Sequence, residues 1–121
     1  MAEPRVTQQH CVLAVPDIRA TADWWVEIMG MEIWMEPDGW IFLRMDSFSL
    51  MIGECPDAIP PRDLGDHQYF AYVVLDDVNA YHAQITAHGL DVAAPQDKPW
   101  GMREMHVQTP DGHRIMFGQN L

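Results

Sequence analysis

The two halves of this chain repeat one pattern, and this internal repeat constrains the fold more than any other feature. Residues 12–33 and residues 72–92 align at an offset of 60, which places Asp17 over Asp77. Each half reads as a strand, an aspartate, a helix, a glycine and a second strand. The sequence therefore predicts two copies of one structural unit.

An aspartate and a glycine flank the predicted helix of each half. The aspartates suit the N-cap, because a carboxylate there accepts hydrogen bonds from free N–H groups of the first turn. The glycines, Gly30 and Gly89, suit the left-handed conformation that ends a helix. Residues between them recur at helical spacing, namely Ile18, Ala22, Trp25 and Met29 in the first half and Val78, His82 and Ile85 in the second.

Apolar runs separated by turn residues predict that three strands follow the helix in each half, and the second strand named above is the first of these three. Segments such as Pro37-Asp38-Gly39 and Pro110-Asp111-Gly112 separate these runs, and Asp-Gly tolerates the positive φ angles of tight turns. The predicted strands are 31–36, 40–45 and 48–53 in the first half and 90–94, 102–108 and 113–118 in the second.

Residues 56–66 contain three prolines and one glycine, which is typical of a linker. We therefore predict a single domain, residues 1–121, composed of two βαβββ modules. The first module covers about 6–55 and the second about 67–120. Because each module combines one helix with hairpin-linked strands, the predicted fold class is α+β.

The composition excludes several classes of partner. The chain has 7 Lys and Arg against 18 Asp and Glu, for a net charge of −11, so we expect no binding to nucleic acid or anionic membranes. No apolar run approaches the ~18 residues of a membrane span, and the first ten residues lack the apolar core of a signal peptide. The two cysteines, Cys11 and Cys55, form no disulfide framework. We therefore expect a cytoplasmic protein.

Three segments carry a resemblance to a known superfamily. They are His10–Asp17 at the start, and Pro99–Glu104 and Thr109–Ile115 near the end. Together with the repeat, they resemble the vicinal-oxygen-chelate superfamily of glyoxalase I, extradiol dioxygenases and bleomycin-resistance proteins. The resemblance implies mixed sheets that curl into a cup-shaped cavity, and it implies a homodimer of the bleomycin-resistance type.

The same resemblance identifies four positions at which the metal enzymes of this superfamily bind their ion. In this chain those positions hold His10, Met51, Phe70 and Met116. Phenylalanine offers no donor atom and thioethers prefer soft metals, so the set is poor for zinc, nickel or iron. Glu54 and His67 lie at odd offsets from these positions, so each would need a bulge to reach the cup.

Strand alternation divides the predicted strands into two faces. One face is apolar and is expected under the helices: Leu13, Val15, Ile41, Leu43, Leu50, Ile52, Val73, Ile115 and Phe117. The face toward the cup also carries Val12, Arg44, Ser49, Gly53, Gln108 and Glu104, although Glu104 could instead form a surface pair with Arg103. A mixed aromatic, thioether and polar lining is typical of a small-molecule site.

The leading hypothesis is metal-independent binding of a small aromatic or cationic organic molecule, which resembles drug sequestration in antibiotic resistance. It requires no cofactor and no catalysis. The expected ligand-binding residues are His10, Trp40, Phe42, Met51, Phe70, Tyr72, Trp100, His106, Arg114 and Met116. The first alternative is a glyoxalase-type lyase or dioxygenase that holds a divalent metal with His10 and either Glu54 or His67. A second is a metal-free enzyme with His10 or His106 as the catalytic acid or base.

Overall fold

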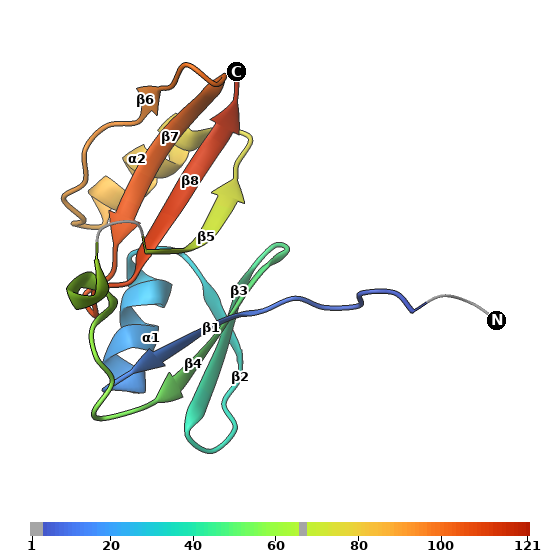
Figure 1. The fold of residues 1–121 in the computed structure, drawn as a ribbon, viewed down its shortest axis with the longest axis vertical. Helices are drawn as coiled ribbons and strands as arrows, with labels where there is room; N and C mark the ends of the chain where they lie inside the picture. Colours follow the sequence, from blue (N-terminus) through green and yellow to red (C-terminus); the bar gives the residue numbers. More distant parts are fainter. Residues whose placement is uncertain (1–3, 66–67) are drawn as a thin grey trace.

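Two four-stranded mixed sheets form the frame of the molecule (Figure 1). We describe them from a computed structural model that covers residues 4–65 and 68–121. In each sheet the first strand runs parallel to the last, and all other neighbours are antiparallel. The first sheet has the order β1 (Cys11–Val15), β4 (Phe48–Glu54), β3 (Trp40–Met45), β2 (Glu32–Met35), and the second has the order β5 (Tyr69–Val74), β8 (Arg114–Asn120), β7 (Met102–Gln108), β6 (Gln96–Asp97). The predicted α+β fold and the repeated arrangement of strands are confirmed.

One helix packs on each sheet, α1 (Ile18–Glu27) on the first and α2 (Val78–Ala87) on the second. The predicted caps are confirmed, because Asp17 Oδ1 accepts from the Ala20 amide at 3.1 Å and Asp77 Oδ1 from the Ala80 amide at 3.0 Å. The linker adds the short 3-10 helix η1 (Pro61–Leu64). In the part of the chain that the structure describes, no helix is long and apolar enough to cross a bilayer.

The strand predicted at 90–94 is wrong. The strand at this place is β6, which covers only Gln96 and Asp97 and pairs with β7. Leu90 and Val92 are instead half-buried against the core, and the Val92 carbonyl accepts a hydrogen bond from His82 Nε2 at 3.1 Å. The apolar residues of this run therefore pack against the core without pairing as a strand. Hydrophobicity alone does not distinguish these two cases.

The predicted apolar face forms the core. Eight of its nine residues are buried, whereas Val73 on the edge strand β5 is only half-buried. Trp25 on α1 is fully buried, and its ring lies 6.3 Å from the rings of both Phe48 and Phe70, centroid to centroid. Because Phe48 belongs to the first module and Phe70 to the second, Trp25 joins the two modules.

Two hydrogen bonds support this junction. The buried Tyr81 hydroxyl on α2 donates to the Met29 carbonyl after α1 at 2.7 Å. The Thr21 hydroxyl on α1 donates to Asp111, in the turn before β8, at 2.5 Å. Burial raises the pKa of Tyr81, so this side chain stays a donor over the whole physiological range.

We expect Trp25→Ala to lower the free energy of unfolding by about 3–5 kcal/mol, because it leaves a large cavity between the modules. Trp24→Ala is the matched control: Trp24 neighbours Trp25 on α1 but is only half-buried, so its loss is expected to be nearer ~1 kcal/mol. Urea denaturation measures both values. Equal losses for the two variants would contradict the role assigned to Trp25.

Candidate ligand-binding site

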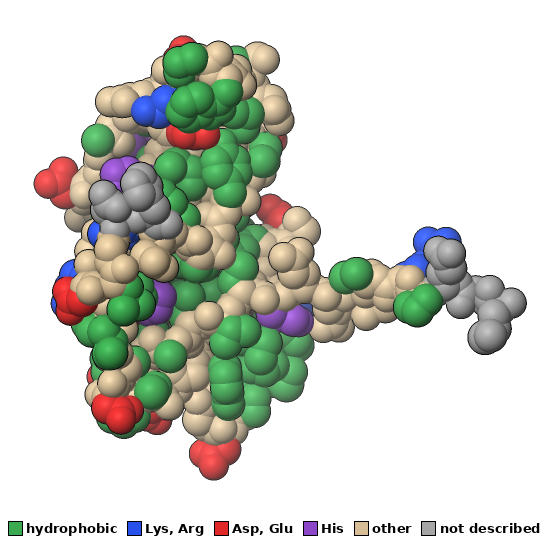
Figure 2. All heavy atoms as spheres, in the orientation of Figure 1, with side chains coloured by type: hydrophobic (Ala, Val, Ile, Leu, Met, Phe, Trp, Pro, Cys, Tyr) green, Lys and Arg blue, Asp and Glu red, His purple; other side chains and the backbone are tan. Residues whose placement is uncertain are grey.

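A cleft lies on the second module, and we call it the second-module cleft. Its volume is about 460 Å³, within the range of roughly 300–1,000 Å³ that is typical of small-molecule sites. Its lining comprises Tyr69, Ala93, Ala94, Gln96, Lys98, Trp100, Glu104, Met105, His106 and Met116. Three of the residues predicted to bind ligand, Trp100, His106 and Met116, therefore lie together. In Figure 2 hydrophobic side chains gather on both modules on the face toward the viewer.

Glu104 on β7 connects the cleft to two aromatic side chains. Its Oε2 accepts a hydrogen bond from the Tyr72 hydroxyl at 2.7 Å and another from Trp100 Nε1 at 3.0 Å. Burial, together with the hydrogen bond to this carboxylate and its negative charge, raises the pKa of Tyr72 to about 12. Tyr72 is therefore a neutral donor at physiological pH, and the carboxylate fixes two of its aromatic neighbours.

The turn between β6 and β7 places Trp100 over this cluster. The Lys98 amide donates to the Met102 carbonyl at 2.8 Å, and the Gly101 amide donates to the Lys98 carbonyl at 3.1 Å. Gly101 has a φ of +81°, a conformation that glycine adopts without strain. Trp100 itself remains 65% exposed, so its ring can still cover a ligand.

A glycine on β8 makes the Tyr72–Glu104 contact possible. Gly118 pairs with Glu104, and the Tyr72 side chain crosses directly over it. A Cβ atom at position 118 would lie 2.7 Å from Tyr72 Cζ and would overlap the hydroxyl group. The absence of a side chain at this position therefore lets Tyr72 reach from β5 to β7.

The corresponding face of the first module is aromatic as well. His10 stacks on Trp34 with centroids 6.5 Å apart, and Trp34 lies 5.6 Å from Phe42. The Arg44 guanidinium lies over the Trp34 ring at 5.5 Å from its centroid. Trp34 is absent from the predicted site residues. It is the extra residue at a bulge of β2, and plain alternation after Ile33 would have placed it on this face.

A second bulge corrects the placement of Phe70. The pairing of β5 with β8 shifts between Tyr69 and Ala71, so Phe70 has no partner in the ladder. Its ring packs on the core side, with its centroid 6.3 Å from that of the Trp25 ring and 6.2 Å from that of the His113 ring. Tyr69 takes the open face instead, where its ring lies 6.4 Å from His106. At the bulge Phe70 contacts Trp25 of the other module, and the local sequence does not reveal a contact between modules.

Burial lowers the pKa of His113, against the opposing charge of Asp111, so this histidine is neutral beside Phe70.

The remaining predicted site residues are Arg114, Trp40 and Met51. Arg114 donates to the Gly65 carbonyl at 2.6 Å, so it holds the linker and lies outside the second-module cleft. On the first module, Trp40 covers Gly53 and is partly exposed. Met51 pairs with Phe42 across β3 and β4, and is half-buried.

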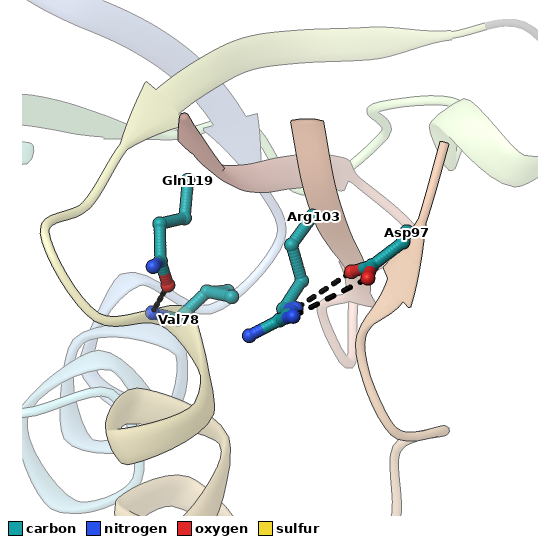
Figure 3. Close-up of polar contacts among 4 residues, drawn as sticks. All are labelled: Val78, Asp97, Arg103 and Gln119. Carbon is teal, nitrogen blue, oxygen red and sulfur yellow. Dashed lines mark hydrogen bonds and ion pairs between the residues drawn. The ribbon is translucent and has the colours of Figure 1, made fainter. Parts of the chain in front are cut away.

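Arg103 and Glu104 do not form the surface pair that was one interpretation of the sequence. The Arg103 guanidinium instead binds Asp97, with Nε at 2.6 Å from Oδ1 (Figure 3). Gln119, its partner across β7 and β8, accepts from the Val78 amide at the start of α2 at 2.9 Å. Arg103 therefore has its own carboxylate partner, separate from Glu104.

The donor set does not fit a hard divalent metal. Within residues 4–65 and 68–121, no three His, Cys, Asp or Glu side chains gather in a way that could hold an ion. The register of β1 with β4 is unbroken from Leu50 to Glu54, which pairs Glu54 with Val15 of the core face. Glu54 is thereby directed away from His10, while His67 lies outside the described residues. The metal alternative that uses His67 stays a prediction.

Comparisons with known proteins agree with this architecture. The sequence matches the model of the Glyoxalase/Bleomycin resistance protein/Dioxygenase superfamily over residues 7–117. A bleomycin resistance determinant encoded on transposon Tn5 has the same fold, with a TM-score of 0.80, 22% identity, and coverage of 95% of this chain and 98% of that one. The structure of a bleomycin-binding protein complexed with bleomycin matches with a TM-score of 0.78 and 22% identity, and the match covers 96% of this chain and 100% of that one. The structure of TnmS3, an antibiotic binding protein from Streptomyces sp. CB03234, matches with a TM-score of 0.74 and 24% identity, and the match covers 98% of this chain and 100% of that one. A search of curated proteins finds no significant match.

We expect Gly118→Ala to lower the free energy of unfolding by about 1–3 kcal/mol, the usual cost of overpacking. The cost arises from the overlap with Tyr72, so it should fall close to zero when Gly118→Ala is made in a Tyr72→Ala background. Urea denaturation of the wild type, the two single variants and the double variant gives the coupling free energy between positions 72 and 118. If the cost is the same in both backgrounds, Tyr72 does not occupy the space above Gly118.

Proposed function

Because the chain belongs to the Glyoxalase/Bleomycin resistance protein/Dioxygenase superfamily, we propose that it binds a small aromatic or cationic organic molecule without a metal ion, and so sequesters it. The observation that carries this proposal is the second-module cleft, where Tyr69, Trp100 and His106 offer ring faces around a volume of about 460 Å³. Aromatic rings of a ligand stack on such faces. Met116 adds an adaptable apolar wall.

Two of the structurally similar proteins support an antibiotic-like ligand. One is a bleomycin-binding protein and the other, TnmS3, is an antibiotic binding protein. The net charge of −11 also favours a cationic molecule, because a negative surface raises its local concentration. The thioethers of Met51 and Met116, which are weak ligands for zinc, nickel and iron, support binding without a metal.

We further propose that the protein acts as a homodimer in the cytoplasm. Trp100 is 65% exposed and Tyr72 is 46% exposed, so one chain alone leaves much aromatic surface open to water. A second copy over these faces would bury that surface and enclose the ligand. Sedimentation equilibrium should give twice the 13.9 kDa mass of one chain. A single-chain mass at all concentrations up to the millimolar range would contradict the dimer.

Binding is tested by isothermal titration with bleomycin, 9-aminoacridine and acridine. We expect at least one of them to bind, and Trp100→Ala to weaken that binding about tenfold, because a stacked ring contributes roughly 1–3 kcal/mol. Trp24→Ala, on helix α1, should leave binding unchanged. If no panel member binds, the proposed function fails. If both variants weaken binding equally, the second-module cleft is not the site.

The absence of a metal requirement is tested on the same protein. We expect the affinity to be unchanged after dialysis against a chelator, and elemental analysis to find less than stoichiometric nickel, zinc or iron. Stoichiometric metal that is lost in His10→Ala would instead support the lyase or dioxygenase alternative.

A further inference from the structure

The two modules differ most clearly at one pair of equivalent positions. In the first sheet, Trp40 pairs with Gly53, and its ring lies over that glycine. In the second sheet, Glu104 pairs with Gly118 in the same way, and the Tyr72 side chain covers the glycine. Glu104 therefore stands where the first module has an indole ring. The fold itself does not need a charge at this position.

The surroundings of Glu104 leave its charge uncompensated. The residue is only 9% exposed, and both of its hydrogen bonds come from neutral donors to the same oxygen, Oε2. Within the described residues, Oε1 accepts no hydrogen bond, and no Lys, Arg or His forms an ion pair with this carboxylate. A largely buried carboxylate without a cationic partner is costly, because burial removes the water that would otherwise stabilise the charge.

Two basic side chains close to Glu104 in the sequence, Arg103 and Lys98, have other hydrogen-bond partners. Arg103, the adjacent residue on β7, binds Asp97. Lys98 also lines the second-module cleft, but its Nζ donates to the Gln96 side chain at 3.3 Å. The missing positive charge can therefore be supplied by a ligand in the cleft.

We propose that Glu104 is the residue that recognises a cationic, hydrogen-bond-donating group on an aromatic ligand, such as an amidinium or a protonated ring amine. The inference rests on the proposed binding function and narrows its ligand class. The ligand cation pairs with the Glu104 carboxylate, while its ring lies against Tyr69 and Trp100, whose faces also attract positive charge. Tyr72 and Trp100 hold the carboxylate in place, so for this interaction they are positioning residues.

The test compares two ligands with the same ring system, 9-aminoacridine, which is a cation at neutral pH, and acridine, which is neutral. Isothermal titration gives the affinity of both for the wild type, Glu104→Gln and Glu27→Gln. Glutamine keeps the size of Glu104 and still accepts from Tyr72 and Trp100. Glu27 is exposed on α1, so Glu27→Gln is a control for the same change in net charge.

We expect the wild type to prefer 9-aminoacridine, and Glu104→Gln to lower that affinity by about tenfold, equivalent to ~1.4 kcal/mol. The affinity for acridine should change less than about twofold, and Glu27→Gln should change neither value. A thermal unfolding midpoint equal to or above that of the wild type confirms that Glu104→Gln is folded, because the change removes a largely buried charge.

Other outcomes separate the inference from the function on which it rests. Two results would show that Glu104 does not recognise the ligand cation while the binding function stands. In the first, the wild type binds both ligands equally; in the second, Glu104→Gln weakens the binding of both ligands equally. In the second case Glu104 serves only to position the aromatic walls. If the wild type binds only bleomycin, which is itself a cationic aromatic molecule, Glu104→Gln and Glu27→Gln are compared on bleomycin instead. Equal affinities of these two variants would show that Glu104 does not recognise the cation, while binding stands. If the wild type binds no panel member at all, both proposals fail.

Discussion

The contact of Trp25 with both modules is the interaction on which the remaining structure depends. Its ring lies against Phe48 of one sheet and Phe70 of the other, and it is fully buried. Burying this side chain also costs free energy, because the buried Trp25 Nε1 has no hydrogen-bond partner among the described residues. The packing of the large ring outweighs that lost hydrogen bond.

This core contact also shapes the open face of the second module. Phe70 reaches Trp25 because β5 bulges between Tyr69 and Ala71. The same bulge places Tyr69 beside His106 in the cleft. One irregularity of a single strand therefore serves the junction between the modules and the lining of the candidate site, which is a common role of bulges near functional sites.

The sequence predicted those features that depend on local physics. The caps Asp17 and Asp77 were predictable from the repeat, and so was the division of most strands into a core face and an open face, because cap chemistry and strand period are local. The errors have non-local causes. Phe70 turns toward a helix of the other module, and the run at 90–94 packs without joining a ladder. The partners of Glu104 were also beyond prediction, because they come from β5 and from the turn before β7.

Duplication explains the frame, and divergence between the copies explains the site. Gly53 and Gly118 occupy equivalent positions, but the first supports a tryptophan and the second a tyrosine–carboxylate pair. The first open face is accordingly aromatic with a guanidinium over Trp34, whereas the second is aromatic with a carboxylate. The proposed specificity thus lies where the two halves differ.

The location of the bound ligand is the most direct test of this account. Backbone and indole N–H resonances of the protein can be followed by NMR as 9-aminoacridine is added. The account predicts that the largest shifts fall on the Trp100 indole, which donates to Glu104, and on the amides of His106 and Met116. Shifts that are centred instead on Ile59 and Leu64, which belong to the linker and line a separate cleft, would contradict it.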